Sequence, residues 1–141
     1  MEHPLKTLWE KPSRLVIGFM SGTSADGVDA ALVRITGYST RTRAEQLGFC
    51  FVPFSDEVRA EILRLAGGGA ATAADFCRMN FLLGELFCEA GEALCAQTGT
   101  KLSDIDLIGS HGQTFWHIPE KEEYLSHAFT STFQLGEEAV L

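Results

Sequence analysis

The chain has 141 residues, of which 45% are hydrophobic and 21% are charged, so it can form one domain with a buried core and is neither disordered nor fibrous. Nineteen acidic residues against eleven basic ones give a net charge of −8 at pH 7. A chain with this charge repels a phosphate backbone, so we expect no nucleic-acid partner, while a local site for an anionic ligand stays open.

The cysteines and the N-terminal residues indicate the compartment. Cys50, Cys77, Cys88 and Cys95 form no C-x-x-C pair and lack the histidine spacing of a structural zinc site. The last three fall in an apparently helical segment, where we expect small buried hydrophobic residues. Residues 1–13 contain two prolines and no long apolar run, which predicts an N-terminal tail without a signal peptide or membrane segment. We therefore expect a cytoplasmic protein with no membrane partner.

Three consecutive strands are predicted at the start of residues 14–141. Residues 15–19 and 28–35 are apolar runs on either side of a small, polar, glycine-containing turn, and residues 44–52 alternate at period two. The simplest arrangement is an antiparallel meander in which the first two strands are central.

Two helices follow in the sequence. Ser55 is a suitable N-cap for a helix that ends at the three glycines 67–69. Thr72, with Asp75 three residues later, predicts a capping box for a longer helix that ends at Gly99. The apolar Phe and Met stripe of this longer helix indicates core packing.

The last part of the chain returns to strand character. We predict a strand at 104–109, a charged and irregular stretch at 120–131, and a short strand at 132–135. The predicted order is β-β-β-α-α-β-loop-β, an α/β fold whose mixed sheet has a parallel return after the helices. Residues 136–141 begin a further pattern that stops, so the sequence is expected to be the front part of something larger.

The turn between the first two strands carries the most informative chemistry. Gly22 and Gly27 allow close backbone approach to a ligand, and the hydroxyls of Ser21, Thr23 and Ser24 can hold an anion. Asp26 and Asp29 are suited to orient a hydrated Mg²⁺. The same composition is also typical of an ordinary polar hairpin. Neither a G-x-x-x-x-G-K-[ST] loop nor a helix-opening G-x-G-x-x-G is present.

A second polar motif, Ser-His-Gly-Gln-Thr at 110–114, follows the strand at 104–109. Open α/β sheets bind ligands at the ends of such strands, and His111 and Gln113 can hydrogen-bond a hydroxyl-rich ligand. Trp116 and His117 would then form a stacking wall for a sugar. The alternative is a half-buried histidine and an aromatic side chain that packs against the edge of the sheet.

These two motifs together resemble a known family. The run Ile-Gly-Phe-Met-Ser-Gly-Thr-Ser-Ala-Asp-Gly-Val-Asp at 17–29 and the run Gly-Ser-His-Gly-Gln-Thr-Phe-Trp-His at 109–117 are similar to the N-terminal part of anhydro-N-acetylmuramic acid kinases. Ala25 stands where that family commonly has Leu, and the connection at 120–131 is longer than usual. The resemblance implies an actin-like (RNase H-like) ATPase domain that is incomplete at its C-terminus.

The resemblance also implies an activity. Such kinases use ATP and Mg²⁺ to phosphorylate the 6-oxygen of 1,6-anhydro-N-acetylmuramic acid while water opens the ring, a step of peptidoglycan recycling. It implies Mg²⁺ contact through water at Asp26, a sugar site at His111, Gly112, Gln113 and Thr114, and a catalytic base in a Gly-Asp-Phe-Arg-type motif beyond Leu141. The ATP-binding residues implied are Gly22, Thr23, Ser24, Ala25, Asp26, Gly27, Val28 and Asp29.

Three further expectations follow from this resemblance. Because the base and the second half of the ATP site are expected elsewhere, we expect the chain alone to be inactive. A kinase of another 1,6-anhydro sugar, such as levoglucosan, would share the phosphate turn, and a non-catalytic actin-like binding domain is a further alternative. A homodimer of the full-length protein is also compatible with the family.

Overall fold

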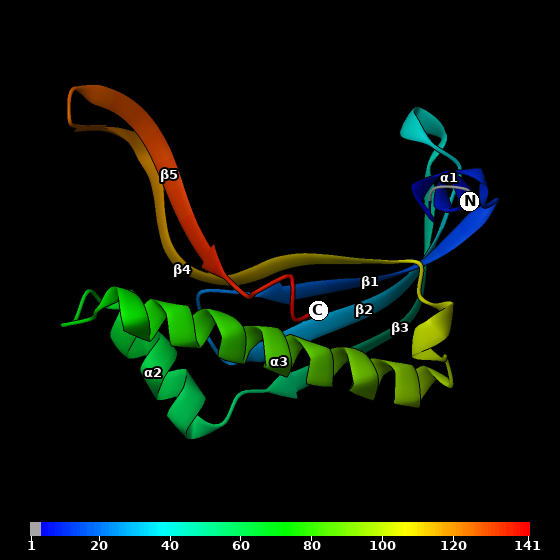
Figure 1. Ribbon diagram of the computed structural model, residues 1–141, viewed down its shortest axis with the longest axis horizontal. Helices are drawn as coiled ribbons and strands as arrows, with labels where there is room; N and C mark the ends of the chain where they lie inside the picture. Colours follow the sequence, from blue (N-terminus) through cyan, green and yellow to red (C-terminus); the bar gives the residue numbers. More distant parts are fainter. Residues whose placement is uncertain (1–3) are drawn as a thin grey trace.

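A five-stranded mixed sheet, in the order β3-β2-β1-β4-β5, forms the frame of the computed structural model, which describes residues 4–141. The long helix α3 crosses one face of this sheet, and α2 lies beside the first half of α3 (Figure 1). The elements are α1 (Pro4–Glu10), β1 (Ser13–Ser21), β2 (Gly27–Thr36), β3 (Arg43–Pro53), α2 (Asp56–Ala66), α3 (Ala73–Thr98), β4 (Leu107–Tyr124) and β5 (His127–Leu135).

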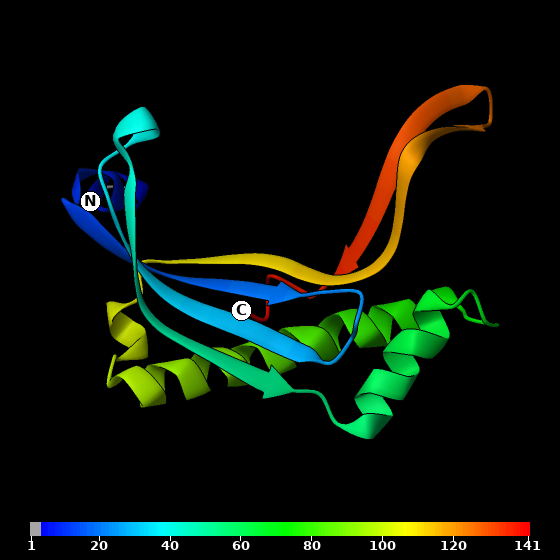
Figure 2. The ribbon, with the colours of Figure 1, turned by 180° about the vertical axis from the view of Figure 1, so that it is seen from behind.

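The predicted antiparallel meander is confirmed. β1 pairs with β2 and β2 pairs with β3, both antiparallel, so β1 and β2 are central strands. After the helices, β4 returns parallel to β1 on its other side. Figure 2, seen from behind, shows the three strands of the meander lying side by side, with α3 on their far side. The polar turn between β1 and β2 therefore lies at one end of the sheet, next to β4.

Both predicted helix starts and stops are confirmed. Ser55 is the N-cap of α2, and its hydroxyl oxygen accepts a hydrogen bond from the Val58 N–H at 3.2 Å. Thr72 and Asp75 form the capping box of α3, and Gly99 ends that helix in the left-handed conformation. Each such cap contributes about 1 kcal/mol, because it satisfies backbone groups that the helix leaves unpaired.

The core lies between α3 and the central strands. The rings of Phe19 on β1 and Phe87 on α3 stack, with 5.8 Å between their centroids. Gly91 allows this approach, since a β-carbon there would lie 3.0 Å from Cζ of Phe19. Burial of a Leu or Phe side chain contributes about 1.5–3 kcal/mol to stability. Other fully buried apolar side chains include Ile17, Leu32, Ile62, Leu83 and Leu94.

Asp106 joins β1 to the start of β4. Its N–H donates to the carbonyl oxygen of Leu15 at 2.8 Å, and the Leu15 N–H donates to its Oδ2 at 2.9 Å. The Lys11 ammonium donates to Oδ1 of the same carboxylate. Burial opposes ionisation of Asp106, but the hydrogen bonds from Lys11 and Leu15 outweigh it and hold the pKa of Asp106 below its ordinary value.

The predicted irregular stretch at 120–131 is wrong, because these residues belong to a long β-hairpin. β4 runs without interruption from Leu107 to Tyr124 and pairs antiparallel with β5. The hairpin leaves the sheet and curves away from its plane (Figure 1). The motif at 110–114 therefore lies inside a strand and not where a strand meets a loop.

The hairpin gave no strand signal because most of its side chains face solvent on both sides, so its sequence has no apolar alternation. Its two-residue turn, Leu125 and Ser126, has positive φ at both positions, where Asn-Gly is the usual signature. Pro119 lies where the pairing with β5 shifts register, between Ile118 and Glu122, so its missing N–H is tolerated.

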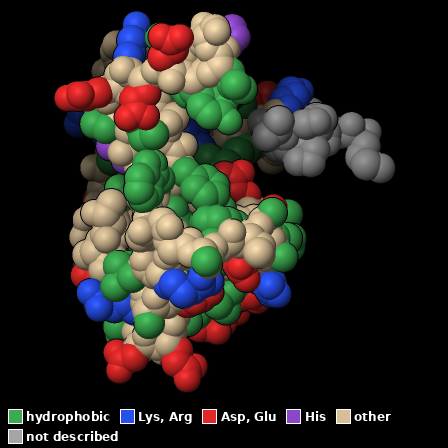
Figure 3. All heavy atoms as spheres, turned by 90° about the vertical axis from the view of Figure 1, so that its left-hand side faces the viewer, with side chains coloured by type: hydrophobic (Ala, Val, Ile, Leu, Met, Phe, Trp, Pro, Cys, Tyr) green, Lys and Arg blue, Asp and Glu red, His purple; other side chains and the backbone are tan. Residues whose placement is uncertain are grey.

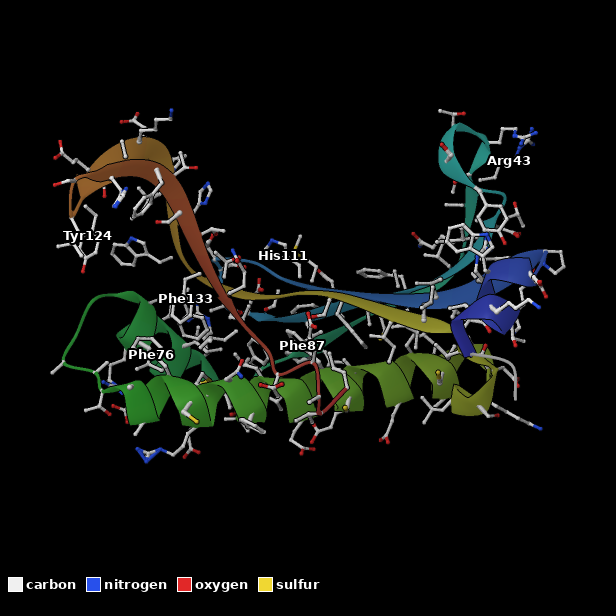
Figure 4. All side chains as sticks on the ribbon, turned by 45° about the horizontal axis from the view of Figure 1, so that its top comes forward. Arg43, Phe76, Phe87, His111, Tyr124 and Phe133 are labelled. Atoms are coloured by element: carbon white, nitrogen blue, oxygen red, sulfur yellow. The ribbon has the colours of Figure 1, made fainter. Side chains whose placement is uncertain are left out.

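An aromatic cluster anchors the base of this hairpin to α3. Phe76 of α3 lies 6.2 Å from Phe115 of β4 and 5.6 Å from Phe133 of β5, measured between ring centroids. Figure 4 shows Phe76 and Phe133 facing one another across the gap between helix and hairpin. Figure 3 views the molecule from the side of the hairpin. Hydrophobic side chains lie in the middle of this view, with charged side chains above and below them.

The N-terminal tail, the cysteines and the lengths of the helices were also considered in the sequence, and the structure describes each of them in part. The predicted tail contains α1, which begins at Pro4, a residue well suited to a first helical turn. The part of the tail at 1–3 lies outside the described residues. The four cysteines are free, and Cys95 is buried as expected, but Cys77 is exposed. Within residues 4–141 no helix is long and apolar enough to cross a membrane.

Candidate functional site

The turn between β1 and β2 presents hydroxyl and carboxylate groups to solvent. Thr23, Ser24, Asp26 and Asp29 are all exposed. The Ser24 hydroxyl donates to Oδ1 of Asp26 at 2.9 Å, and the Ala25 N–H donates to the carbonyl oxygen of Gly22 at 3.1 Å. The turn is therefore closed by its own backbone, and its polar side chains are directed outward.

The other candidate residues of the turn shape its backbone. Ala25 and Val28 are each 1% exposed and belong to the core, and Ala25 has a φ of +49°. Gly27 is required by close packing, since a β-carbon there would lie 2.3 Å from the carbonyl oxygen of Val52. Gly22 differs, because the nearest atom to a β-carbon there is the Ser24 Oγ at 4.0 Å. The fold does not need a glycine at position 22, which leaves open space for a ligand.

A β-bulge positions the second motif. Phe19 pairs with Ser110, but Ser21 pairs with Gln113, so β4 contains one residue more than β1 over this stretch. Gly112 lies in the bulge with a φ of +71°, and a β-carbon there would lie 2.6 Å from the carbonyl oxygen of Leu135. Because of this extra residue, the side chains of β4 after Gly112 point to the opposite face from the one that simple alternation from Ser110 would give.

The bulge directs Gln113 into the protein. Its side chain is 0% exposed, and Nε2 donates to the carbonyl oxygens of Gly22 at 2.7 Å and Thr114 at 2.9 Å. Its Oε1 lies 2.6 Å from the hydroxyl of Ser21, which is 1% exposed. Gln113 thus contacts the β1–β2 turn from inside the protein, and both polar atoms of its amide already have hydrogen-bond partners there.

His111 lies on the opposite side of β4. Its side chain is exposed, and Figure 4 shows it across the sheet from Phe87 and α3. Met20 and Asp29 are paired across β1 and β2 and are also exposed on this face. Two of the predicted sugar residues therefore differ in access, since His111 is open to solvent and Gln113 is not. Thr114 is partly buried, and Gly112 is buried.

The face of the sheet opposite α3, called the open face below, also contains two paired glycines that the sequence did not single out. We call these residues, Gly18 and Gly109, the glycine floor. Gly18 of β1 pairs with Gly109 of β4, and a β-carbon on either residue would meet no atom within 4 Å. Glycine inside a strand is typical of a place where a ligand or another backbone approaches closely. That signal was available in the sequence. Ser21, one of the three hydroxyls expected to hold an anion, is instead 1% exposed and hydrogen-bonded inside the protein, so that prediction is wrong for Ser21.

The residues of the turn suit an indirect metal contact better than direct ligation. Among residues 4–141, no three His, Cys, Asp or Glu side chains gather closely enough to hold a metal ion. The exposed carboxylates of Asp26 and Asp29 can accept hydrogen bonds from metal-bound water, as Mg²⁺ in phosphate sites usually keeps several waters. The site is thus a turn with two exposed hydroxyl groups and two exposed carboxylates.

Comparison with known proteins identifies the family. The family model for anhydro-N-acetylmuramic acid kinase matches residues 14–141. A protein named anhydro-N-acetylmuramic acid kinase from Caldanaerobacter subterraneus subsp. tengcongensis is 48% identical over 137 residues, which cover 97% of this chain and 35% of that protein. Proteins of the same name from Bacillus thuringiensis subsp. konkukian and Bacillus cereus strain AH820 are 39% identical over 126 residues, or 89% of this chain and 32% of theirs. The chain spans about a third of the length of these relatives, and it belongs to the anhydro-N-acetylmuramic acid kinase family.

Proposed function

We propose that this chain supplies the ATP phosphate turn and part of the sugar site of a kinase acting on 1,6-anhydro-N-acetylmuramic acid. Water adds to the anomeric carbon, the bond from that carbon to the 6-oxygen breaks, and the 6-oxygen takes the γ-phosphoryl group of ATP. The products are N-acetylmuramic acid 6-phosphate and ADP, in peptidoglycan recycling. The observation that carries the proposal is the family match over residues 14–141, which includes both polar motifs.

In this proposal the turn at 22–29 binds ATP and the motif at 111–114 belongs to the sugar site. The exposed hydroxyls of Thr23 and Ser24 donate hydrogen bonds to the phosphates of ATP. The exposed carboxylates of Asp26 and Asp29 accept hydrogen bonds from the waters of Mg²⁺. The remaining members of the predicted ATP site, which shape the turn, are Gly22, Ala25, Gly27 and Val28. When bound, Mg²⁺ neutralises charge on the transferring phosphoryl group.

The sugar lies on the open face of the sheet in this proposal. His111 is exposed there, next to the glycine floor of Gly18 and Gly109, and contacts a hydroxyl or the 6-oxygen of the sugar. Gly112, in the bulge of β4, sets the position of His111, and Gln113 and Thr114 follow it on the same strand. The mixed sheet, with its meander and parallel return, supports the actin-like (RNase H-like) ATPase fold that the family resemblance implies.

We propose that the base that activates water lies outside residues 14–141, in the part of the relatives' sequences that this chain does not cover. A positioned general base contributes about 10²–10⁴-fold, and enclosing two ligands between domains contributes about 7–11 kcal/mol through orientation. We therefore propose that the 141-residue chain alone does not turn over the sugar.

A coupled assay of ADP release tests the proposal. The grafted kinase is the Caldanaerobacter relative in which residues 14–141 of this chain replace the matching segment; the 141-residue chain is assayed beside it. With ATP, Mg²⁺ and 1,6-anhydro-N-acetylmuramic acid, the grafted kinase is expected to turn over at about 1 s⁻¹ or faster, and the chain alone at background. An inactive but folded graft would contradict the proposal, and a preference for levoglucosan would support the other sugar.

A further inference from the structure

The buried amide of Gln113 takes part in three hydrogen bonds. Both hydrogens of its amide nitrogen are used, one on the carbonyl oxygen of Gly22 and one on that of Thr114. This fixes the orientation of the amide, because the reverse orientation would place its oxygen against two carbonyl oxygens. Oε1 therefore faces the hydroxyl of Ser21 as an acceptor.

Ser21 extends this contact to the other side of the turn. Its hydroxyl lies 2.6 Å from Oε1 of Gln113 and 2.6 Å from the carbonyl oxygen of Gly27. It has one proton for these two acceptors, so it bridges the first residue of β2 and the bulge of β4. The two ends of the turn, at Gly22 and Gly27, are thus tied to one buried pair of side chains.

Such a pair is costly unless it is fully hydrogen-bonded. A buried amide without partners loses about 1–3 kcal/mol, and an apolar side chain would fill the same space without that risk. The carbonyl of Gly22 immediately precedes the exposed groups at Thr23 and Ser24. Because this carbonyl and the N–H of Thr23 belong to one planar peptide unit, fixing the carbonyl fixes the direction of that N–H.

We propose that Gln113 is a positioning residue that ties the β1–β2 turn to the bulge of β4, so that the phosphate turn and His111 are held in one fixed relation. The inference rests on the proposed function and adds to it. Gln113 then acts on ATP through the backbone of the turn and does not itself contact the sugar. Its loss should affect the nucleotide more than the sugar.

Steady-state kinetics of Gln113→Leu in the grafted kinase test this assignment. We expect the KM for ATP to rise about tenfold or more, with a smaller change in the KM for the sugar. The matched control is Gln97→Leu, which removes a 3.0 Å hydrogen bond from an exposed glutamine to the carbonyl oxygen of Phe49, at the far end of α3. That control should leave both KM values unchanged. An equal rise in both variants would overturn the proposal.

Ser21→Ala keeps the proposal testable if Gln113→Leu does not fold. It removes one hydroxyl from the buried pair and should raise the KM for ATP severalfold. The double variant should be no worse than Gln113→Leu alone, because both changes break the same tie. Unchanged KM for ATP in folded Ser21→Ala and Gln113→Leu would refute the positioning role.

Hydrogen exchange in the 141-residue chain separates this proposal from the proposed function. Amides of residues 22–29 should exchange about tenfold faster in Gln113→Leu than in the unmodified chain, while those of α3 keep their protection. Faster exchange with an inactive graft would support the tie and reject the kinase assignment. Unchanged exchange at the turn would reject the tie, whatever the graft does.

Discussion

Gly112 and the carbonyl oxygen of Leu135 are pressed together where β4 bulges beside the end of β5. A β-carbon at position 112 would lie 2.6 Å from that oxygen, closer than side chains approach a backbone atom, and φ is +71°. This point of the bulge therefore has room for glycine only. The inward direction of Gln113 and the outward direction of His111 both depend on the bulge.

Gly112→Ala should therefore destabilise the chain. A non-glycine residue at this φ costs about 1–3 kcal/mol, and the contact with Leu135 adds to that cost. We expect a loss of at least about 2 kcal/mol in the free energy of unfolding, measured by urea denaturation. Gly109→Ala on the same strand is the control, since a β-carbon there meets nothing within 4 Å. Equal stability of the two variants would show that the bulge can relax.

Gly22→Val tests the phosphate turn in the grafted kinase. The nearest atom to a β-carbon at position 22 is 4.0 Å away, so the fold should tolerate the change. A branched side chain would instead occupy the space that the phosphates need. We expect the KM for ATP to rise about tenfold or more with the midpoint denaturation temperature unchanged. Unchanged ATP affinity would remove Gly22 from the nucleotide site.

His111→Ala tests the sugar site in the same enzyme. We expect the larger effect in the KM for the sugar or in kcat, with the KM for ATP little changed, because His111 lies on the open face. His127→Ala, at the far end of the hairpin, is the matched control and should be neutral. A rise confined to the KM for ATP would assign His111 to the nucleotide.

Asp106 should make the stability of the chain depend on acidity. Its pKa is lowered in the folded protein, so the unfolded chain takes up the proton first as the pH falls. The stabilisation is complete above the unfolded pKa, about 3.9, and is lost as the pH falls through the folded value. We expect Asp106→Asn to have a lower midpoint denaturation temperature at pH 7.

Thermal unfolding of this variant at several pH values checks the sign. The difference from the unmodified chain should shrink as the pH falls below about 4. Asp104→Asn is the control, because it makes the same substitution at an exposed side chain nearby. A difference that grows toward low pH would contradict the assigned role of the Asp106 carboxylate.

Local signals explain what the sequence predicted correctly. The meander follows from apolar runs separated by turns, and the starts of α2 and α3 follow from caps at Ser55 and Thr72, whose partners lie within three residues. The end of α3 at Gly99 was equally local. These features needed no knowledge of distant contacts.

The remaining features depend on contacts between distant residues. The direction of Gln113 is reversed by one extra residue in β4, and that bulge is fixed by Leu135, which is distant in the chain. The hairpin was missed because its exposed faces have no alternation and Leu125 and Ser126 are unusual in such a turn. A glycine at 112 between polar residues was the available sign that a bulge lies there.

The single strand β4 contains both the bulge and the tip of the hairpin, which has a mechanical consequence. Tyr124 lies eleven residues beyond Gln113 on the same strand, a path of ~36 Å at 3.3 Å per residue. A rotation of ~5° at the bulge would therefore displace the tip by up to ~3 Å over that length. The buried pair of Ser21 and Gln113 lies at the base of this arm, so a small change in the direction of β4 there is amplified toward the tip.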